Sequence, residues 1–122
     1  MKKIMKKAIT AIICAMLLVG TMGMTALAAS GDIWGNLSGN WGTATLQNTS
    51  GNTRYCVITI RQYDYDPSKY TLVSSNQAVM SSGNTVTTRG EISDMHAIGV
   101  GLVYNSAQYQ SGIGWRDTTQ IK

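Results

Sequence analysis

Apolar and polar residues alternate along most of the chain, and the pattern is clearest in the segment from Tyr55 to Tyr63. In an extended conformation Cys56, Ile58 and Ile60 would point to one side, and the two tyrosines would point to the other. The segment is rich in β-branched side chains, which lose rotamer freedom in a helix and pack well in a sheet. We therefore expect a central β-strand with one face in the core and one face outward.

Similar alternation recurs roughly every 10 to 14 residues. Further strands are expected over residues 41–48, 70–79, 85–92, 97–105 and, from a weaker pattern, 108–115. Residues 49–52 are turn formers, so the strand before them and the central strand after them are expected to pair as an antiparallel hairpin. Pro67 suits the second position of a type I turn after the central strand.

No helical period appears after residue 28, which indicates the all-β class. We expect a small antiparallel β-sandwich over residues 41–115, because two sheets can share one set of apolar side chains as a core. A small β-barrel is the alternative. The expected core set is Leu46, Ile58, Ile60, Val86, Ile98, Val100 and Leu102.

Residues 1–28 have the features of a secretory signal peptide: a lysine-rich head, an apolar stretch from Ala8 to Val19, and the small-residue site Ala26-Leu27-Ala28. The apolar stretch is short for a membrane span, which needs about 20 residues. We expect cleavage after Ala28, a secreted, extracellular protein, and no integral membrane association after cleavage. The short basic leader is of the bacterial type.

Two segments flank the predicted domain. Residues 29–40 are rich in Gly and Asn, and are expected to form a flexible N-terminal arm or a short edge strand. Residues 116–122 are expected to be a polar C-terminal tail.

Loss of the leader changes the charge of the protein. Four of the ten Lys and Arg residues lie in it, whereas all six Asp and Glu residues follow it, so the formal net charge falls from +4 to near zero. Nucleic acids and anionic membranes are bound by basic surfaces. Neither is therefore expected as a partner of the secreted protein.

Residues suited to catalysis or metal binding are few. Cys56 alone remains after cleavage and is expected to be a small buried hydrophobe, with an intermolecular disulfide or a reactive thiol as alternatives. His96 and Asp94 could complete a catalytic set only if they converged on this thiol outside the core. Asp64 and Asp66 are better explained as turn formers than as calcium ligands. We expect no enzymatic activity, no metal and no cofactor.

The aromatic residues are the most distinctive feature. All three Trp and all six Tyr lie after residue 28, and the chain has no Phe. Such rings combine an apolar body with a polar tip, which suits stacking on sugar rings or docking of a protein. Tyr55 and Tyr63 are candidate binding residues on the outward strand face, with plain surface as the alternative, and Trp34, Trp41 and Trp115 are further candidates.

These features predict a secreted, non-catalytic binding module that recognises a cell-surface or extracellular glycan, or a protein, through Tyr and Trp on a β face. A secreted bacteriocin-like antagonist is the first alternative and an enzyme the second. No motif of a known family is evident. Sequons of the N-x-Ser/Thr type occur at Asn36 and Asn48, and would matter only in a secretory pathway that glycosylates.

Overall fold

The computed structural model describes residues 29–122, so the predicted signal peptide lies outside the described residues. This part of the chain forms strands and no helix. In chain order the strands are β2 (Gly31–Ser38), β3 (Trp41–Asn48), β4 (Arg54–Tyr63), β5 (Thr71–Met80), β6 (Thr85–Glu91), β7 (His96–Tyr104) and β8 (Ile113–Gln120). Within residues 29–122, accordingly, no helix is long and apolar enough to cross a membrane.

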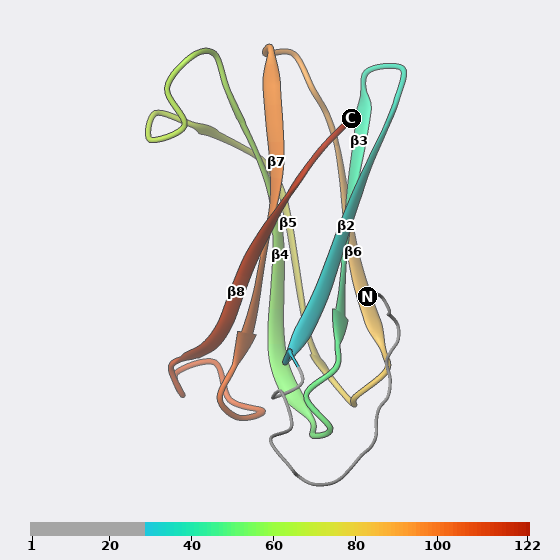
Figure 1. Cartoon of the computed structure of the whole chain (residues 1–122), viewed down its shortest axis with the longest axis vertical. Helices are drawn as coiled ribbons and strands as arrows, with labels where there is room; N and C mark the ends of the chain where they lie inside the picture. Colours follow the sequence, from blue (N-terminus) through green and yellow to red (C-terminus); the bar gives the residue numbers. More distant parts are fainter. Residues whose placement is uncertain (1–28) are drawn as a thin grey trace, which may run out of the picture.

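The strands make two antiparallel sheets, one in the order β2-β3-β6 and the other in the order β5-β4-β7-β8. Figure 1 shows them as two layers, the four-stranded sheet on the left and the three-stranded sheet on the right. The edge strands β2 and β8 lie against each other across one side, and β5 and β6 do so across the other. The expected all-β fold with antiparallel sheets is confirmed, and the sheets do not close into a barrel.

The core lies between the two sheets and is centred on β4. Cys56, Ile58 and Ile60 are fully buried there, as the alternation predicts, and Leu46 of β3 is fully buried opposite them. β4 pairs with β5 on one side and β7 on the other, so it is central in its sheet as expected. The pairing with β5 shifts register between Ile60 and Arg61, where Val73 of β5 has no partner.

The inward face of β7 is the opposite of the predicted one. Ile98 and Leu102 were expected in the core, but Gly99 and Gly101 face the other sheet instead. A Cβ added at Gly99 would lie 2.9 Å from the Cβ of Ala44, so the sheets approach too closely here for a side chain. The larger β7 side chains therefore line the outer face of the four-stranded sheet.

Val100 belongs to this outer row as well, although it is almost completely buried. Its register partners Thr59 and Thr118 flank it on the neighbouring strands. Burial alone therefore does not place a residue between the sheets in this fold.

The predicted hairpin between residues 41–48 and 55–63 is wrong, because β3 and β4 belong to different sheets. The connection between them crosses the end of the domain, and the Asn48 side chain holds it in place through hydrogen bonds. Its side-chain amide donates to the carbonyl oxygens of Asn52, at 2.8 Å, and Met80, at 2.9 Å. Its side-chain oxygen accepts from the backbone N–H of Ser50 at 3.0 Å.

The two flanking segments are ordinary edge strands. β2 occupies most of residues 29–40 and pairs along its full length with β3. Residues 116–120 belong to β8, and Ile121 beyond them is buried in the core. The glycines of β2 mark close contacts: a Cβ at Gly35 would lie 2.7 Å from the Cδ1 atom of Ile121. The glycine-rich composition therefore reflects tight packing against the C-terminal segment, not a loose arm.

Candidate binding surfaces

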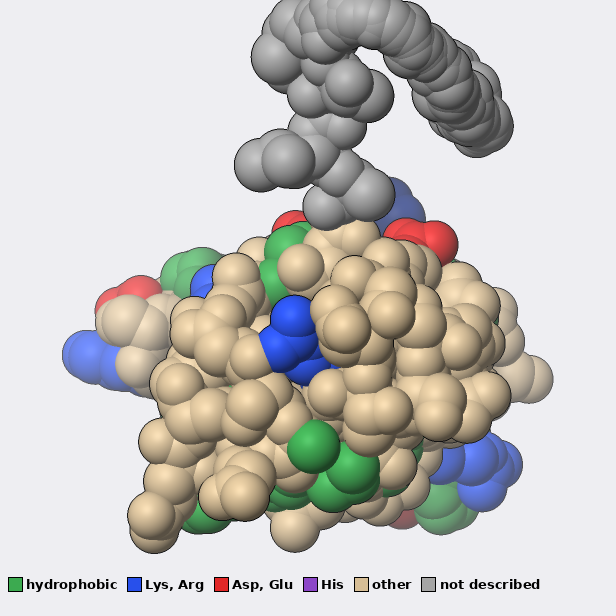
Figure 2. All heavy atoms as spheres, turned by 90° about the horizontal axis from the view of Figure 1, so that it is seen from below, with side chains coloured by type: hydrophobic (Ala, Val, Ile, Leu, Met, Phe, Trp, Pro, Cys, Tyr) green, Lys and Arg blue, Asp and Glu red, His purple; other side chains and the backbone are tan. Residues whose placement is uncertain are grey.

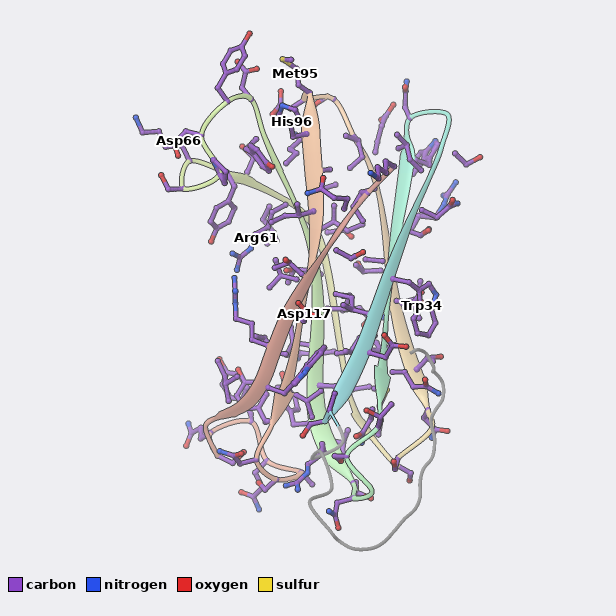
Figure 3. All side chains as sticks on the ribbon, in the orientation of Figure 1. Trp34, Arg61, Asp66, Met95, His96 and Asp117 are labelled. Carbon is purple, nitrogen blue, oxygen red and sulfur yellow. The ribbon has the colours of Figure 1, made fainter. Side chains whose placement is uncertain are left out.

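The five candidate binding residues do not form one site. Trp34 and Trp41 lie on the outer face of the three-stranded sheet, and Tyr55 and Tyr63 lie on the outer face of the four-stranded sheet. Trp115 has neither position. Figure 3 shows the separation of the two faces, because Trp34 and Arg61 point away from the two sheets in opposite directions.

The outer surface of the three-stranded sheet, named here the tryptophan face, is rich in hydroxyl and amide groups. Its side chains are Asp32, Trp34, Asn36 and Ser38 of β2, Trp41, Thr43, Thr45 and Gln47 of β3, and Thr85, Thr87, Arg89 and Glu91 of β6. Trp34 is 45% exposed and Trp41 is 42% exposed. Both tryptophans are therefore partly exposed to solvent, with small polar side chains between them.

Contacts across the strands hold parts of the tryptophan face in place. The guanidinium carbon of Arg89 lies 4.1 Å from the ring centroid of Trp41, a cation–π contact. The hydroxyl groups of Thr45 and Thr87 are hydrogen bonded at 2.9 Å. A surface that is already ordered loses less conformational entropy when a ligand binds.

The spacing of the two tryptophans follows from the strand register. Trp34 pairs with Thr45, which lies four residues from Trp41 along β3. At about 3.4 Å per residue, the backbone positions of the two tryptophans are separated by about 14 Å along the strand direction. This distance exceeds the width of one sugar ring, so both indoles together can contact only an extended ligand.

Tyr55 is not the exposed platform that the alternation indicated. It is only 8% exposed, because its ring packs edge-on against Tyr104, at a centroid distance of 5.0 Å, and against Tyr109, at 5.3 Å. Its hydroxyl group donates a hydrogen bond to the side-chain oxygen of Gln77 at 2.7 Å. The direction is fixed because an amide oxygen can only accept. A pocket of about 400 Å³ is lined by Tyr55, Gln77 and Tyr109.

Tyr63 lies at the opposite end of β4 from this cluster. Its ring is half-buried and packs against the ring of His96, with the centroids 5.2 Å apart. Figure 3 shows His96 at the tip of β7. The two candidate tyrosines therefore occupy different environments at the two ends of one sheet face.

Trp115 packs at the open side between the sheets. It is half-buried beside the core, and a Cβ at Gly31 would lie 2.6 Å from its ring. Its position in β8 gives it the inward face together with its register partner Val103. This tryptophan closes the edge between β2 and β8, so its role in the structure is packing.

The residues weighed for catalysis are not brought together. Cys56 pairs with Val103 in the sheet, seven residues along β7 from His96, which places the thiol and the imidazole about 23 Å apart along the strand. Burial raises the pKa of the Cys56 thiol to about 11, an effect only partly offset by Arg54. A buried, protonated thiol is a poor nucleophile.

The Asp64–Asp66 turn uses its carboxylate locally. The side chain of Asp66 accepts hydrogen bonds from the backbone N–H of Ser68, at 3.0 Å, and from its hydroxyl group, at 2.8 Å. These bonds lower the pKa of the Asp66 carboxyl, so it stays ionised in its role as a turn former. Among the described residues, no group of three or more His, Cys, Asp or Glu side chains is arranged to hold a metal ion.

Several residues of these surfaces were missed from the sequence. The alternation along β3 and β6 places Thr43, Thr45, Thr87 and Arg89 on outward faces, but no local pattern shows that these two strands lie side by side. The partners of Tyr55 in the pocket were not considered, because the loop that carries Tyr109 is 54 residues away in the chain. No known family model matches the chain, and no curated protein is significantly similar to it in sequence.

Proposed function

We propose that the protein is a secreted, non-catalytic binding module, and that it binds an extended, uncharged glycan chain across the tryptophan face. The observation that carries this proposal is the presence of two partly exposed tryptophans on one sheet face, with hydroxyl and amide side chains between them. Indole rings stack on the apolar faces of sugars, and the polar side chains supply hydrogen bonds to the sugar hydroxyls.

The shape and charge of the face support a chain-like ligand. The open face of a sheet offers contacts along its length and does not enclose a small molecule. The spacing of about 14 Å between Trp34 and Trp41 fits several consecutive sugar rings. The charged side chains on the face are Asp32, Arg89 and Glu91. Their charges nearly cancel, which favours a neutral ligand.

The arrangement of carboxylates favours binding over hydrolysis. Glycosidases use two carboxyl groups roughly 5 to 10 Å apart. On the tryptophan face, Asp32 pairs with Gln47 and Glu91 pairs with Trp41, six residues away along β3. The two carboxyl groups are thus separated by about 20 Å along the strand direction, too far to act on one glycosidic bond.

The experiment that tests the proposal is a binding assay with insoluble polysaccharides, such as cellulose, chitin and purified cell-wall peptidoglycan. We expect the wild-type protein, beginning at Ala29, to be retained by at least one of them. Trp34→Ala and Trp41→Ala should each weaken retention by more than about 1 kcal/mol, as the loss of an aromatic anchor does, with little change in melting temperature. Tyr65→Ala is the matched control, because Tyr65 is 78% exposed but lies in the turn after β4.

Equal retention of the wild type and both tryptophan variants would contradict the proposal. The same protein added to growing bacteria tests the alternative function. Clearing of the culture without binding to any polysaccharide would favour a secreted antagonist.

A further inference from the structure

The tyrosine pocket on the four-stranded sheet has the features of a second ligand site. It lies at the end of the outer face, where β4 begins and the loop between β7 and β8 folds back. Tyr55 and Tyr109 form its aromatic side, and Tyr104 packs against both rings, with centroid distances of 5.0 and 6.1 Å. The tryptophan face is on the other sheet, so the two surfaces cannot be parts of one continuous groove.

Tyr109 is exposed but held in position. Its side chain is 63% exposed, which leaves the ring free to stack on a ligand. The loop that carries it is pinned at both ends: the N–H of Tyr55 donates to the carbonyl of Ser106 at 2.9 Å, and the N–H of Asn105 donates to the carbonyl of Gly112 at 2.9 Å. The ring is therefore one wall of a partly formed site, and the loop that carries it is held by hydrogen bonds at both ends.

Gln77 gives the pocket a defined polarity. Its side-chain oxygen accepts the hydroxyl hydrogen of Tyr55, which fixes the orientation of the amide. Burial and the neighbouring tyrosines raise the pKa of Tyr55, so this hydroxyl stays protonated and remains a donor at physiological pH. The amide nitrogen of Gln77, with two N–H groups, is then the part of the side chain available to a ligand.

We propose that this pocket is a second binding site, which takes one uncharged ring that carries hydrogen-bond acceptors, namely a single sugar residue at the end of a glycan chain. The ring stacks on Tyr109, and one of its oxygen atoms accepts a hydrogen bond from the Gln77 amide. The residues that line the pocket carry no charge. In the view of Figure 2, uncharged polar side chains and backbone also dominate the adjoining end of the molecule.

The choice of a sugar rests on the proposed function, whereas the existence of a second site does not. With one site on each sheet, the domain would hold one chain along the tryptophan face and the end of another chain in the pocket. The protein would then connect two glycan chains and not merely attach to one.

The test is a titration of the ¹⁵N-labelled protein, beginning at Ala29, with D-glucose, D-galactose and N-acetyl-D-glucosamine, followed by NMR. We expect at least one of these monosaccharides to shift the signals of Gln77 and Tyr109 with a millimolar dissociation constant. Tyr109→Ala should weaken this binding by about tenfold, the size of effect seen when an aromatic anchor is truncated. Tyr65→Ala is the control and should leave it unchanged.

Gln77→Glu separates the role of the amide from that of packing. The carboxylate can still accept the Tyr55 hydroxyl, but it cannot donate to the acetamido carbonyl of N-acetyl-D-glucosamine, so binding of this sugar should weaken while the melting temperature is kept. If this variant proves unstable, Tyr109→Ala still decides the question, because that side chain is largely exposed.

The double variant Trp34→Ala/Trp41→Ala distinguishes the second site from the first. It should lose retention on polysaccharides and keep the monosaccharide shifts at Gln77 and Tyr109. The inference is overturned if no monosaccharide shifts these signals, or if the shifts vanish in the double tryptophan variant. Failure of polysaccharide retention in the wild type would instead count against the proposed function.

Discussion

Replacement of Asn48 by Ala is the sharpest test of how the two sheets are joined. The Asn48 side chain is completely buried at the end of β3, where the chain leaves the three-stranded sheet for β4. Its amide donates to the carbonyls of Asn52 and Met80, and its oxygen accepts from the N–H and the hydroxyl group of Ser50. One side chain thus links the β3–β4 connection to the end of β5.

The expected cost follows from the groups that would lose a partner. The hydrogen bond to the Met80 carbonyl is buried, and an unsatisfied buried polar group costs about 1–3 kcal/mol. The bonds to Asn52 and Ser50 are only partly buried, so water can replace some of them and their loss adds less. We expect Asn48→Ala to lower the free energy of unfolding by about 2–4 kcal/mol. For a domain of this size the melting temperature should fall by roughly 10–25 °C.

Urea unfolding followed by tryptophan fluorescence measures the effect. Asn36→Ala is the matched control, because Asn36 is also a strand asparagine in a sequon but is exposed on β2, and its removal should change stability by less than about 0.5 kcal/mol. Ser50→Ala removes one partner only and should give an intermediate loss. If Asn48→Ala were as stable as Asn36→Ala, the cross-connection would not depend on this side chain and the reasoning would be wrong.

Four further predictions concern the core and the leader. Cys56 should react slowly with thiol reagents in the folded protein and rapidly in denaturant, and Cys56→Ser should cost about 1–3 kcal/mol, because a hydroxyl enters an apolar site. Because its pKa is raised from 9.0 to about 11, the thiol ionises first in the unfolded chain, so stability should fall between these pH values, and Cys56→Ala should abolish that part of the pH dependence. Gly99→Ala should destabilise by about 1–3 kcal/mol, and Ala44→Gly in the same chain should recover part of the loss, measured as a coupling energy in a double-mutant cycle. Mass spectrometry and N-terminal sequencing of the secreted protein should find Ala29 first; a full-length chain retained in the membrane would refute the signal peptide.

The parts of the fold that could be predicted are those in which apolar residues alternate with polar ones. β4 and β3 show this pattern, and their inward residues Ile58, Ile60 and Leu46 are buried as expected. β7 does not, because Ile98 and Leu102 alternate with glycines, and glycine gives no hydrophobic signal. The contact of Gly99 with Ala44 across the core depends on the distance between the sheets, which no local pattern encodes.

Strand pairing could not be predicted for a related reason. The turn residues after Asn48 suit a hairpin and a crossing between sheets equally well. What distinguishes the two is the hydrogen bond to Met80, 32 residues further along the chain. The extent of the edge strands β2 and β8 was underestimated from the sequence. An edge strand can carry polar residues on its outer face and small residues on its inner face, so its apolar alternation is weak.

The same limits explain which site residues were recognised. A count of aromatic residues identifies Trp34 and Trp41 as candidates, and the strand alternation correctly turns Thr45 and Thr87 outward. Their assembly into one surface needs the β2–β3 and β3–β6 pairings, and the second of these brings Thr45 next to Thr87, 42 residues further along the chain. Tyr55 was placed on the correct face of its strand, but its burial could not be foreseen, because the rings that cover it come from β7 and the loop that follows.

The two outer faces of the domain differ in a way that bears on both proposals. The four-stranded sheet presents Val57, Ile98 and Leu102 half-buried on its outer side, whereas the tryptophan face presents Thr at the corresponding central positions. An apolar sheet surface needs cover from neighbouring side chains, and the tyrosine cluster supplies it at one end of β4 by packing rings against one another. Packing against Tyr104 and Tyr109 therefore explains the burial of Tyr55, but it leaves most of the Tyr109 side chain uncovered. That ring remains 63% exposed although its loop is hydrogen bonded in place, and a stacking surface that is ordered before the ligand arrives has the property that recognition requires.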